Sequence, residues 1–210
     1  MRHLGVSYRT AWLIKHKLME TMLQREAGRR LCGRVEIDDA YLGGERSGGK
    51  SGRGSENKVA FVAAVQTTDD GRAVRACLSP RPFTKEAVAD FMGQSLALPL
   101  TLVSDGLACF TVAPAFGAAH ERIITGGGSA SARLPQFRAV NTLLSNLKTA
   151  LAGTYHAVKF AKYAHRYLAE FQYRFNRRFD LRHILGRLAT AAAQTPPQPR
   201  RVIRLAEVGS

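Results

Sequence analysis

Residues 35–44, VEIDDAYLGG, indicate both the fold and the candidate functional site of the chain. Apolar residues running into two glycines are typical of a strand that ends in a turn. Asp38 and Asp39 interrupt this strand, and Glu36 precedes them. Because side chains alternate across a strand, Glu36 and Asp38 share one face and Asp39 points to the other. An acidic group inside an apolar strand costs free energy unless it is paired or binds a cation, so these carboxylates are candidate functional groups.

The segments that follow predict a mixed α/β layout. Residues 59–66 form a continuous apolar run and residues 72–78 alternate weakly, so three strands joined by turns suggest an antiparallel meander. Residues 84–97 predict a helix with Thr84 as its N-cap. The remaining elements expected are strands over 100–104 and 119–124, helices over 137–152, 158–179 and 181–193, and a proline-rich, non-helical tail.

The N-terminal residues are typical of part of a DNA-binding unit. Gly5 and Ser7 form a turn, and a helix with an apolar face and basic residues off that face follows it. A turn followed by such a helix is the second half of a helix-turn-helix. Only four residues precede the turn, so the first helix of the unit is expected to be missing.

The charge of the chain favours a polyanionic partner. The 31 Lys and Arg residues outnumber the 16 Asp and Glu residues, and the net charge is +15. Residues 1–58 carry +5, residues 59–125 carry −1 and residues 126–210 carry +11. This distribution is typical of a catalytic core with polyanion-contacting flanks, and a solvated basic surface is the alternative.

Other classes of protein are disfavoured by what the sequence lacks. No apolar run approaches the roughly 20 residues of a membrane span, and the N-terminus does not resemble a signal peptide. Cys32, Cys77 and Cys109 form no CxxC pair, which argues against a zinc ribbon or a disulfide framework. We therefore expect a cytoplasmic protein that does not associate with a membrane, with its cysteines serving as small buried apolar residues.

A second carboxylate follows a different apolar strand. Asp105 stands at the end of residues 100–104, directly before Gly106. Two aspartates on strands of one sheet form a hard-oxygen site suited to Mg²⁺ or Mn²⁺. Two such ions close together activate a water or a 3′-hydroxyl at a phosphodiester. By spacing alone, a solvated Asp-Gly turn fits equally well.

The helix expected over residues 137–152 carries Asn141 and Lys148. They are seven residues apart, so both lie on one helix face. Asn141 offers a neutral carbonyl oxygen to a metal, and Lys148 offers a positive charge to a phosphate. On its own, this pattern is more typical of an ordinary polar helix face.

Five blocks between about residue 4 and residue 188 resemble one known family. They are VEIDDAYLGG, GRGSENKVAFVAAV, LVSDGLACF, VNTLLSNLKTALAGTYHAV and KYAHRYLAEFQYRFNRRF, in this order. Together they resemble the ISXO-like group of bacterial insertion-sequence transposases, part of the DDE-type, ribonuclease-H-like superfamily. The resemblance implies an α/β fold with a mixed sheet of about five strands flanked by helices. It also implies DNA cleavage at transposon ends and strand transfer into a target.

The resemblance implies roles for particular residues. Asp38 and Asp105 match the family's metal-binding aspartates, and Asp38 is preferred over Asp39 because it matches the aspartate after the VEI strand. Asn141 matches the third metal-binding position, where Asn commonly replaces the glutamate of other DDE enzymes. Lys148 matches the DNA-contacting lysine, so these four residues are the expected catalytic set. The implied cofactor is Mg²⁺ or Mn²⁺, as two ions, and the implied partners are transposon-end DNA, target DNA and further copies of the chain.

The resemblance also suggests the domain organisation. We expect a remnant of a helix-turn-helix over residues 1–30, a ribonuclease-H-like catalytic domain over residues 31–193 and a tail over residues 194–210. The zinc ribbon of full family members is absent from the sequence. A catalytically inactive, truncated DNA-binding remnant is therefore the alternative to an active transposase, and a nuclease of the same fold is a third hypothesis.

Basic residues of a loop and of the long helix predict DNA contacts. Residues 45–58 are rich in Gly and Ser, and the helix over residues 157–179 places most of its basic residues off its apolar stripe. Such residues bind DNA phosphates, and this binding releases counterions from the DNA. At His156, DNA contact and local capping both fit. The residues expected to contact DNA, besides Lys148, are Lys50, Arg53, Lys58, His156, Lys159, Lys162, Arg166, Arg174, Arg177 and Arg178.

Overall fold

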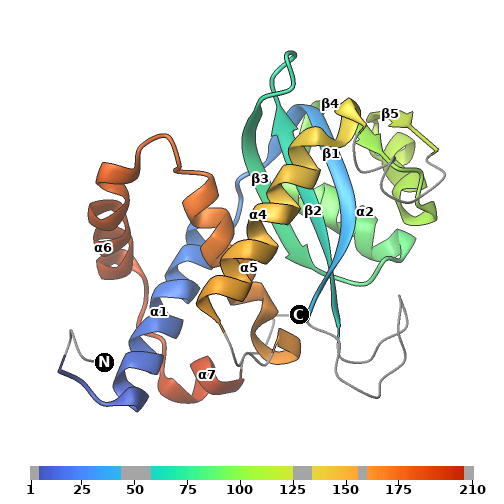
Figure 1. Cartoon of the computed structure of the whole chain (residues 1–210). Coiled ribbons are helices and arrows are strands. Elements are labelled where there is room, and N and C mark those ends of the chain that lie inside the picture. The colour runs from blue at the N-terminus through green and yellow to red at the C-terminus, as the bar shows by residue number, and fades with distance from the viewer. Residues whose placement is uncertain (1–4, 44–57, 125–133, 156–159, 206–210) are drawn as a thin grey trace. The chain divides into compact units, whose positions relative to one another are not determined.

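The computed structural model of the chain describes residues 5–43, 58–124, 134–155 and 160–205 (Figure 1). They fall into two compact units. Gly28–Ala161 form the first, here called the sheet unit. Met1–Ala27 and Lys162–Ser210 form the second, here called the helical unit. Among the described residues, no helix has both the length and the apolar character needed to cross a membrane.

The sheet unit is built on a five-stranded mixed sheet with the order β3-β2-β1-β4-β5. The first three strands form an antiparallel meander, whereas β4 runs parallel to β1 and β5 runs parallel to β4. This confirms the expected mixed sheet of about five strands. The strands are β1 (Leu31–Leu42), β2 (Val59–Thr67), β3 (Ala73–Pro80), β4 (Leu96–Ser104) and β5 (Ala119–Arg122).

The border between α2 (Lys85–Ser95) and β4 differs from the sequence prediction. Thr84 caps α2 as predicted, with its side-chain oxygen accepting from the Ala87 N–H. The chain becomes extended at Leu96, where a helix was expected to continue, because Leu96 pairs with β1 and Pro99 follows closely. Proline disfavours helical backbone at the residue before it.

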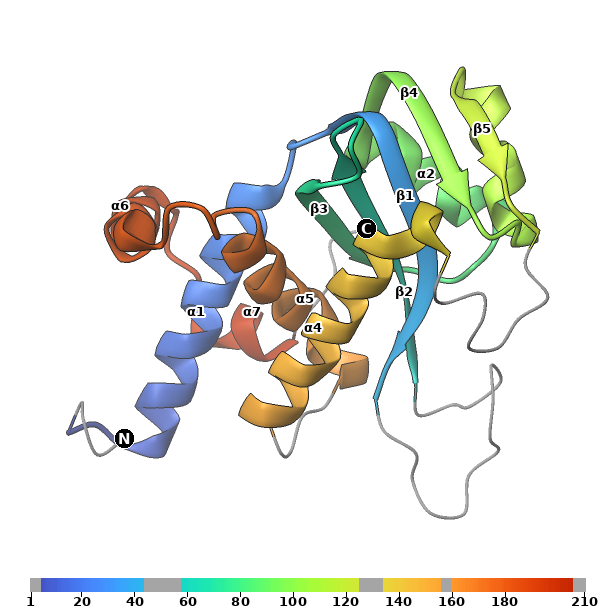
Figure 2. The ribbon, with the colours of Figure 1, turned by 45° about the horizontal axis from the view of Figure 1, so that its top comes forward.

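Helical segments cover both faces of the sheet (Figures 1 and 2). Val35 and Ile37 of β1 are fully buried in a core with Phe91 of α2. The 3₁₀ segment η1 (Ala108–Phe116), which the sequence did not predict, contributes to the same core. A second 3₁₀ turn, η2 (Pro135–Phe137), leads into α4 (Arg138–Thr154) on the opposite face, the face of Glu36 and Asp38. The strand alternation predicted for β1 therefore places Val35 and Ile37 in this core and Glu36 on the side of α4.

The helical unit contains α1, most of α5, the 3₁₀ turn η3, α6 and α7. Helix α1 begins after Ser7, whose side chain caps it as predicted by accepting from the Thr10 N–H. It packs against α6 and α7. The predicted helix is confirmed, but a helix-turn-helix is not. The bounds are α1 (Tyr8–Glu26), α5 (Phe160–Phe175), η3 (Leu181–His183), α6 (Ile184–Gln194) and α7 (Arg200–Leu205).

The C-terminal tail corrects one expectation. Residues 194–210 were expected to be non-helical, yet α7 forms within them and buries Ile203 completely. The carbonyl of Pro199 accepts from the Ile203 N–H, so the prolines precede the helix and do not interrupt it. A further correction concerns Cys32, which is exposed and not a buried apolar residue.

Candidate metal centre

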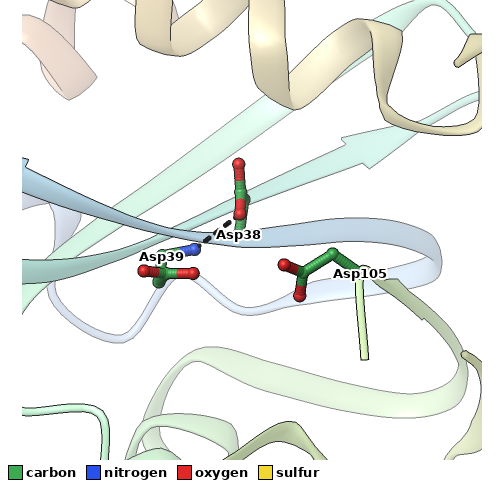
Figure 3. Close-up of side chains that lie close together, drawn as sticks. All are labelled: Asp38, Asp39 and Asp105. Carbon is green, nitrogen blue, oxygen red and sulfur yellow. Dashed lines mark hydrogen bonds between the residues drawn. The ribbon is translucent and has the colours of Figure 1, made fainter. Parts of the chain in front are cut away.

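Three aspartates of the sheet unit lie close together (Figure 3). One carboxylate oxygen from each of Asp38, Asp39 and Asp105 lies within 4.8 Å of the other two. Strands β1 and β4 are parallel neighbours whose register pairs Glu36 with Val103. Asp38 lies two residues after Glu36 on β1, and Asp105 lies two residues after Val103, just past the end of β4. The parallel pairing therefore brings together two aspartates that are far apart in the sequence.

Asp39 joins this cluster although it was not included in the predicted metal set. Asp38 and Asp39 leave β1 on opposite sides, as strand alternation predicts (Figure 3). The Asp39 N–H donates to Oδ1 of Asp38 over 2.9 Å, and the Asp39 carboxylate approaches Asp105 from its own side of the strand. Its position next to Asp38 was the one sequence signal available for it.

The electrostatics of the cluster are those of crowded carboxylates. Burial, together with the charges of Asp39 and Asp105, raises the pKa of Asp38 to about 7. The Asp39 N–H and the charge of Lys148 act in the opposite direction. Carboxylate oxygens are the ligands that Mg²⁺ and Mn²⁺ prefer, so the residues present fit a divalent cation.

Hydrogen bonds and a glycine with positive φ shape the turn that carries Asp105. Gly106 has φ +88°, and a Cβ at this position would lie 2.9 Å from Nε of Arg122. The Arg122 guanidinium donates to the Gly106 carbonyl, and the Leu107 N–H donates to Oδ1 of Asp105. The Ser104 hydroxyl accepts from the Gly106 N–H. These contacts fix the backbone of the turn, and Asp105 itself is half-buried.

Glu36, which precedes the aspartates on β1, has a different role. Its side chain is 1% exposed and pairs with Arg34, whose Nη1 lies 2.8 Å from Oε1. The other oxygen accepts from the Val140 N–H at the start of α4, over 2.9 Å. Arg34 also donates to the Gln136 carbonyl. Because the first N–H groups of a helix lack partners within it, Glu36 both satisfies and anchors the N-terminus of α4.

Helix α4 carries the two remaining predicted catalytic residues. Asn141 is half-buried and directly follows Val140, the residue that Glu36 holds against β1. Lys148 lies on the same helix and is exposed, and its charge lowers the pKa of Asp38. The structure thus brings Asp38 and Asp105 together and puts Asn141 on the anchored turn of α4.

The residues predicted to contact DNA fall into three groups. Lys50, Arg53, His156 and Lys159 lie outside the described residues. Lys162 is exposed, and Lys58 is half-buried just before β2. The remaining arginines make contacts within the helical unit.

Two of these arginines are buried in ion pairs. Arg166 bonds Glu20 over 2.9 Å and the Ile203 carbonyl over 2.7 Å, and its side chain is 3% exposed. Arg177 bonds Glu26, and its side chain is 10% exposed. These contacts satisfy both guanidinium groups inside the helical unit. Arg166 and Arg177 are therefore not included among the residues that we propose to contact DNA.

The other two arginines keep more solvent exposure. Arg174 pairs with Glu170 one helical turn away and is 47% exposed. Arg178 lies over the rings of Phe175 and Phe179, 3.9 and 4.2 Å from their centroids. An i,i+4 pair on a helix surface is weak, so Arg174 keeps charge available for a phosphate.

The mixed sheet, its strand order and the helices on both faces are those of a ribonuclease-H-like α/β fold, with aspartates on β1 and after β4. Residues 30–176 match the model of the ISXO2-like transposase domain, and the chain belongs to this family. The match confirms the resemblance carried by the five sequence blocks. Comparisons with curated proteins and with solved structures give no significant match.

Proposed function

We propose that the chain catalyses DNA transposition of an insertion sequence, by metal-dependent phosphodiester cleavage at the ends of the element and strand transfer into target DNA. One observation carries this proposal. In a chain of a transposase family, carboxylate oxygens of Asp38, Asp39 and Asp105 lie within 4.8 Å of one another on two parallel strands.

Asp38 and Asp105 would hold Mg²⁺ or Mn²⁺, as two ions, and Asn141 would supply the third position. A divalent ion bound there activates the attacking oxygen and stabilises the leaving oxygen. Asp39 adds negative charge on the other side of β1. Lys148, whose charge already acts on Asp38, would contact a phosphate of the DNA next to the scissile bond.

The reaction would proceed in two in-line steps. In the first, a water oxygen bonds to phosphorus as the bond to the 3′-oxygen breaks, which leaves a free 3′-hydroxyl on the element. In the second, the oxygen of this hydroxyl bonds to a phosphorus of the target as the bond from that phosphorus to the target 3′-oxygen breaks, which joins the two DNAs and frees a 3′-hydroxyl on the target. Glu36 would keep Asn141 and Lys148 in register with Asp38 throughout, because it binds the first turn of α4 to β1.

The test uses DNA that contains the sequences flanking the coding region. With Mn²⁺ or Mg²⁺, we expect cleavage by the wild-type chain and none by Asp38→Asn or Asp105→Asn, while gel-shift binding of both variants persists. Asp69→Asn, at an exposed turn between β2 and β3, is the matched control. Full activity of either site variant would contradict the assignment. DNA binding without cleavage by the wild type would instead support the inactive remnant, and nicks without joined products would support a nuclease.

We also propose that the active form is a multimer assembled on DNA. An element has two ends, and each end needs an active site. Sedimentation with end-containing DNA is expected to show at least two copies of the chain per complex. A single copy per complex would contradict this.

A further inference from the structure

The helical unit contains a pocket that the proposed catalysis does not use. Its volume is about 190 Å³. Its walls combine three arginines with three aromatic residues, and none of its lining residues is acidic. They come from α1, α5 and α7, which belong to one compact unit. The residues are Arg9, Arg200, Arg204, Tyr8, Trp12 and Tyr163, with Leu13 completing the lining.

The three arginines differ from those buried elsewhere in the unit. Arg9, Arg200 and Arg204 are exposed, and within the described part of the chain no ion pair holds any of them. Arg166 and Arg177, by contrast, are neutralised by glutamates. The pocket therefore presents guanidinium groups whose fork geometry suits the oxygens of a phosphate.

The aromatic walls are held in place by contacts beneath them. The Trp12 ring lies 4.1 Å from the ring of the buried His16 and meets Tyr163 edge-on at 5.9 Å. The Tyr163 hydroxyl donates to the Arg204 carbonyl over 3.5 Å. Tyr8 is 67% exposed. Aromatic surfaces fixed in this way lose little conformational entropy when a flat ligand stacks on them.

We infer that this pocket binds an unpaired nucleotide of single-stranded DNA, with the base against the aromatic residues and the phosphate on the arginines. Cavities of about 150 Å³ bind benzene, so this pocket admits one planar base. A phosphate alone would leave the aromatic walls unused, and duplex DNA keeps its bases stacked inside the helix. Aromatic faces combined with positive charge are the usual means of binding single strands.

The charge of the whole helical unit supports a nucleic acid. Its 15 Lys and Arg residues and 5 Asp and Glu residues give a net charge of +10, which concentrates a polyanion near the pocket. The choice of DNA rests on the proposed function. The nucleotide chemistry rests on the pocket itself and needs neither the aspartates nor a metal.

The experiment uses the intrinsic fluorescence of Trp12, which is the one tryptophan of the chain. The full chain is titrated in EDTA with oligodeoxythymidylate of about ten nucleotides, with a blunt duplex of equal length and with dTMP. We expect the oligonucleotide to quench Trp12, and the duplex and dTMP to do so only at much higher concentration. The Asp38→Asn variant is expected to bind like the wild type, which separates this result from any failure of cleavage.

The variants test the pocket against general charge. Arg200→Ala, Arg204→Ala and Tyr8→Ala are each expected to weaken oligonucleotide binding about tenfold. Arg201→Ala removes the same charge from α7 at an exposed residue that does not line the pocket, and it should stay within about twofold of the wild type. Circular dichroism verifies the fold of each variant.

Three outcomes would overturn the inference. Equal losses in Arg200→Ala and Arg201→Ala would show that net charge alone binds the strand. Quenching by duplex as strong as by single strand would show a backbone contact without base binding. Equal affinity for dTMP and the oligonucleotide would indicate a site for free nucleotides.

Discussion

Asp38 is the residue of the sheet unit at which burial most clearly opposes ionisation of a carboxyl group. Its carboxyl has a pKa of about 7, against an ordinary value of 3.8, mainly because of burial. The folded chain therefore binds a proton at Asp38 over a pH range in which the unfolded chain has released it. The free energy of unfolding therefore falls as the pH rises from about 4 to about 7, and the loss is complete above that range.

The raised pKa of Asp38 therefore predicts how its replacement changes the stability of the metal-free chain, measured in EDTA. Asp38→Asn removes the charge without changing the shape, so at pH 8 it should raise the free energy of unfolding by about 2–4 kcal/mol. The gain should shrink as the pH falls through 7 and vanish below about pH 4, where Asp38 is protonated in both states. Thermal unfolding as a function of pH measures it. A gain that does not change with pH, or an equal gain in Asp69→Asn, would contradict the prediction.

Metal binding should follow the same titration. A divalent cation and a proton compete for the Asp38 carboxylate, so Mg²⁺ or Mn²⁺ should bind more weakly at pH 6 than at pH 8. At pH 8 the metal should raise the melting temperature of the wild type, because it binds the folded chain alone. Asp38→Asn should lose most of this increase. Calorimetric titration at the two pH values provides the measurement, and pH-independent affinity would argue against Asp38 as a ligand.

At the scale of elements, α4 depends on Glu36 for its attachment to β1. Glu36→Ala would leave the half-buried Arg34 guanidinium without its carboxylate and the Val140 N–H without its acceptor. We expect a loss of about 3 kcal/mol in the free energy of unfolding, and a fall in cleavage because Asn141 and Lys148 shift. Urea unfolding and the cleavage assay measure the two effects.

Two further variants make that experiment specific. Glu36→Gln keeps the shape and one acceptor for Val140, so it should recover part of both losses. Glu121→Ala, an exposed glutamate on β5, should change neither property. Stability lost without any loss of cleavage would show that Glu36 supports the fold alone.

The turn between β4 and η1 depends on Gly106. Gly106→Ala should cost about 1–2 kcal/mol, because an L side chain is strained at φ +88° and the new Cβ crowds Arg122. It should also weaken metal binding, since Asp105 precedes this position. Gly93→Ala is the matched control, because that helical glycine has open space around it and ordinary φ, so alanine should stabilise α2. Equal effects of the two substitutions in thermal unfolding would contradict this account.

The elements were predictable where their signals are local. The apolar run of β2 and the cap at Thr84 lie within a few residues of the structure that they specify. The first half of β4 was missed, because Leu96 becomes extended by pairing with Leu31 of β1. The α7 helix was missed because burial of Ile203 among distant helices outweighs the prolines before it.

At the scale of the whole molecule, the structure redistributes the charge of +15. The sequence places +5 and +11 in its two end segments, and the fold gathers most of both into the helical unit. Inside that unit, Glu20 and Glu26 neutralise Arg166 and Arg177. Of the four arginines that helix periodicity selected, Arg166 and Arg177 are therefore neutralised, whereas Arg174 stays exposed.

The sequence by itself determined the α/β class, the aspartates on β1 and after β4, and the transposase family, because these are written in short blocks of consecutive residues. Only the tertiary structure decided that Asp39 joins the cluster, that Glu36 anchors α4 and that the aromatic and arginine pocket exists. Each of these depends on contacts between residues far apart in the chain, such as Glu36 with Val140 and Trp12 with Tyr163. A repeat pattern within a short segment cannot reveal such pairs, because they form only when distant segments pack together as the chain folds.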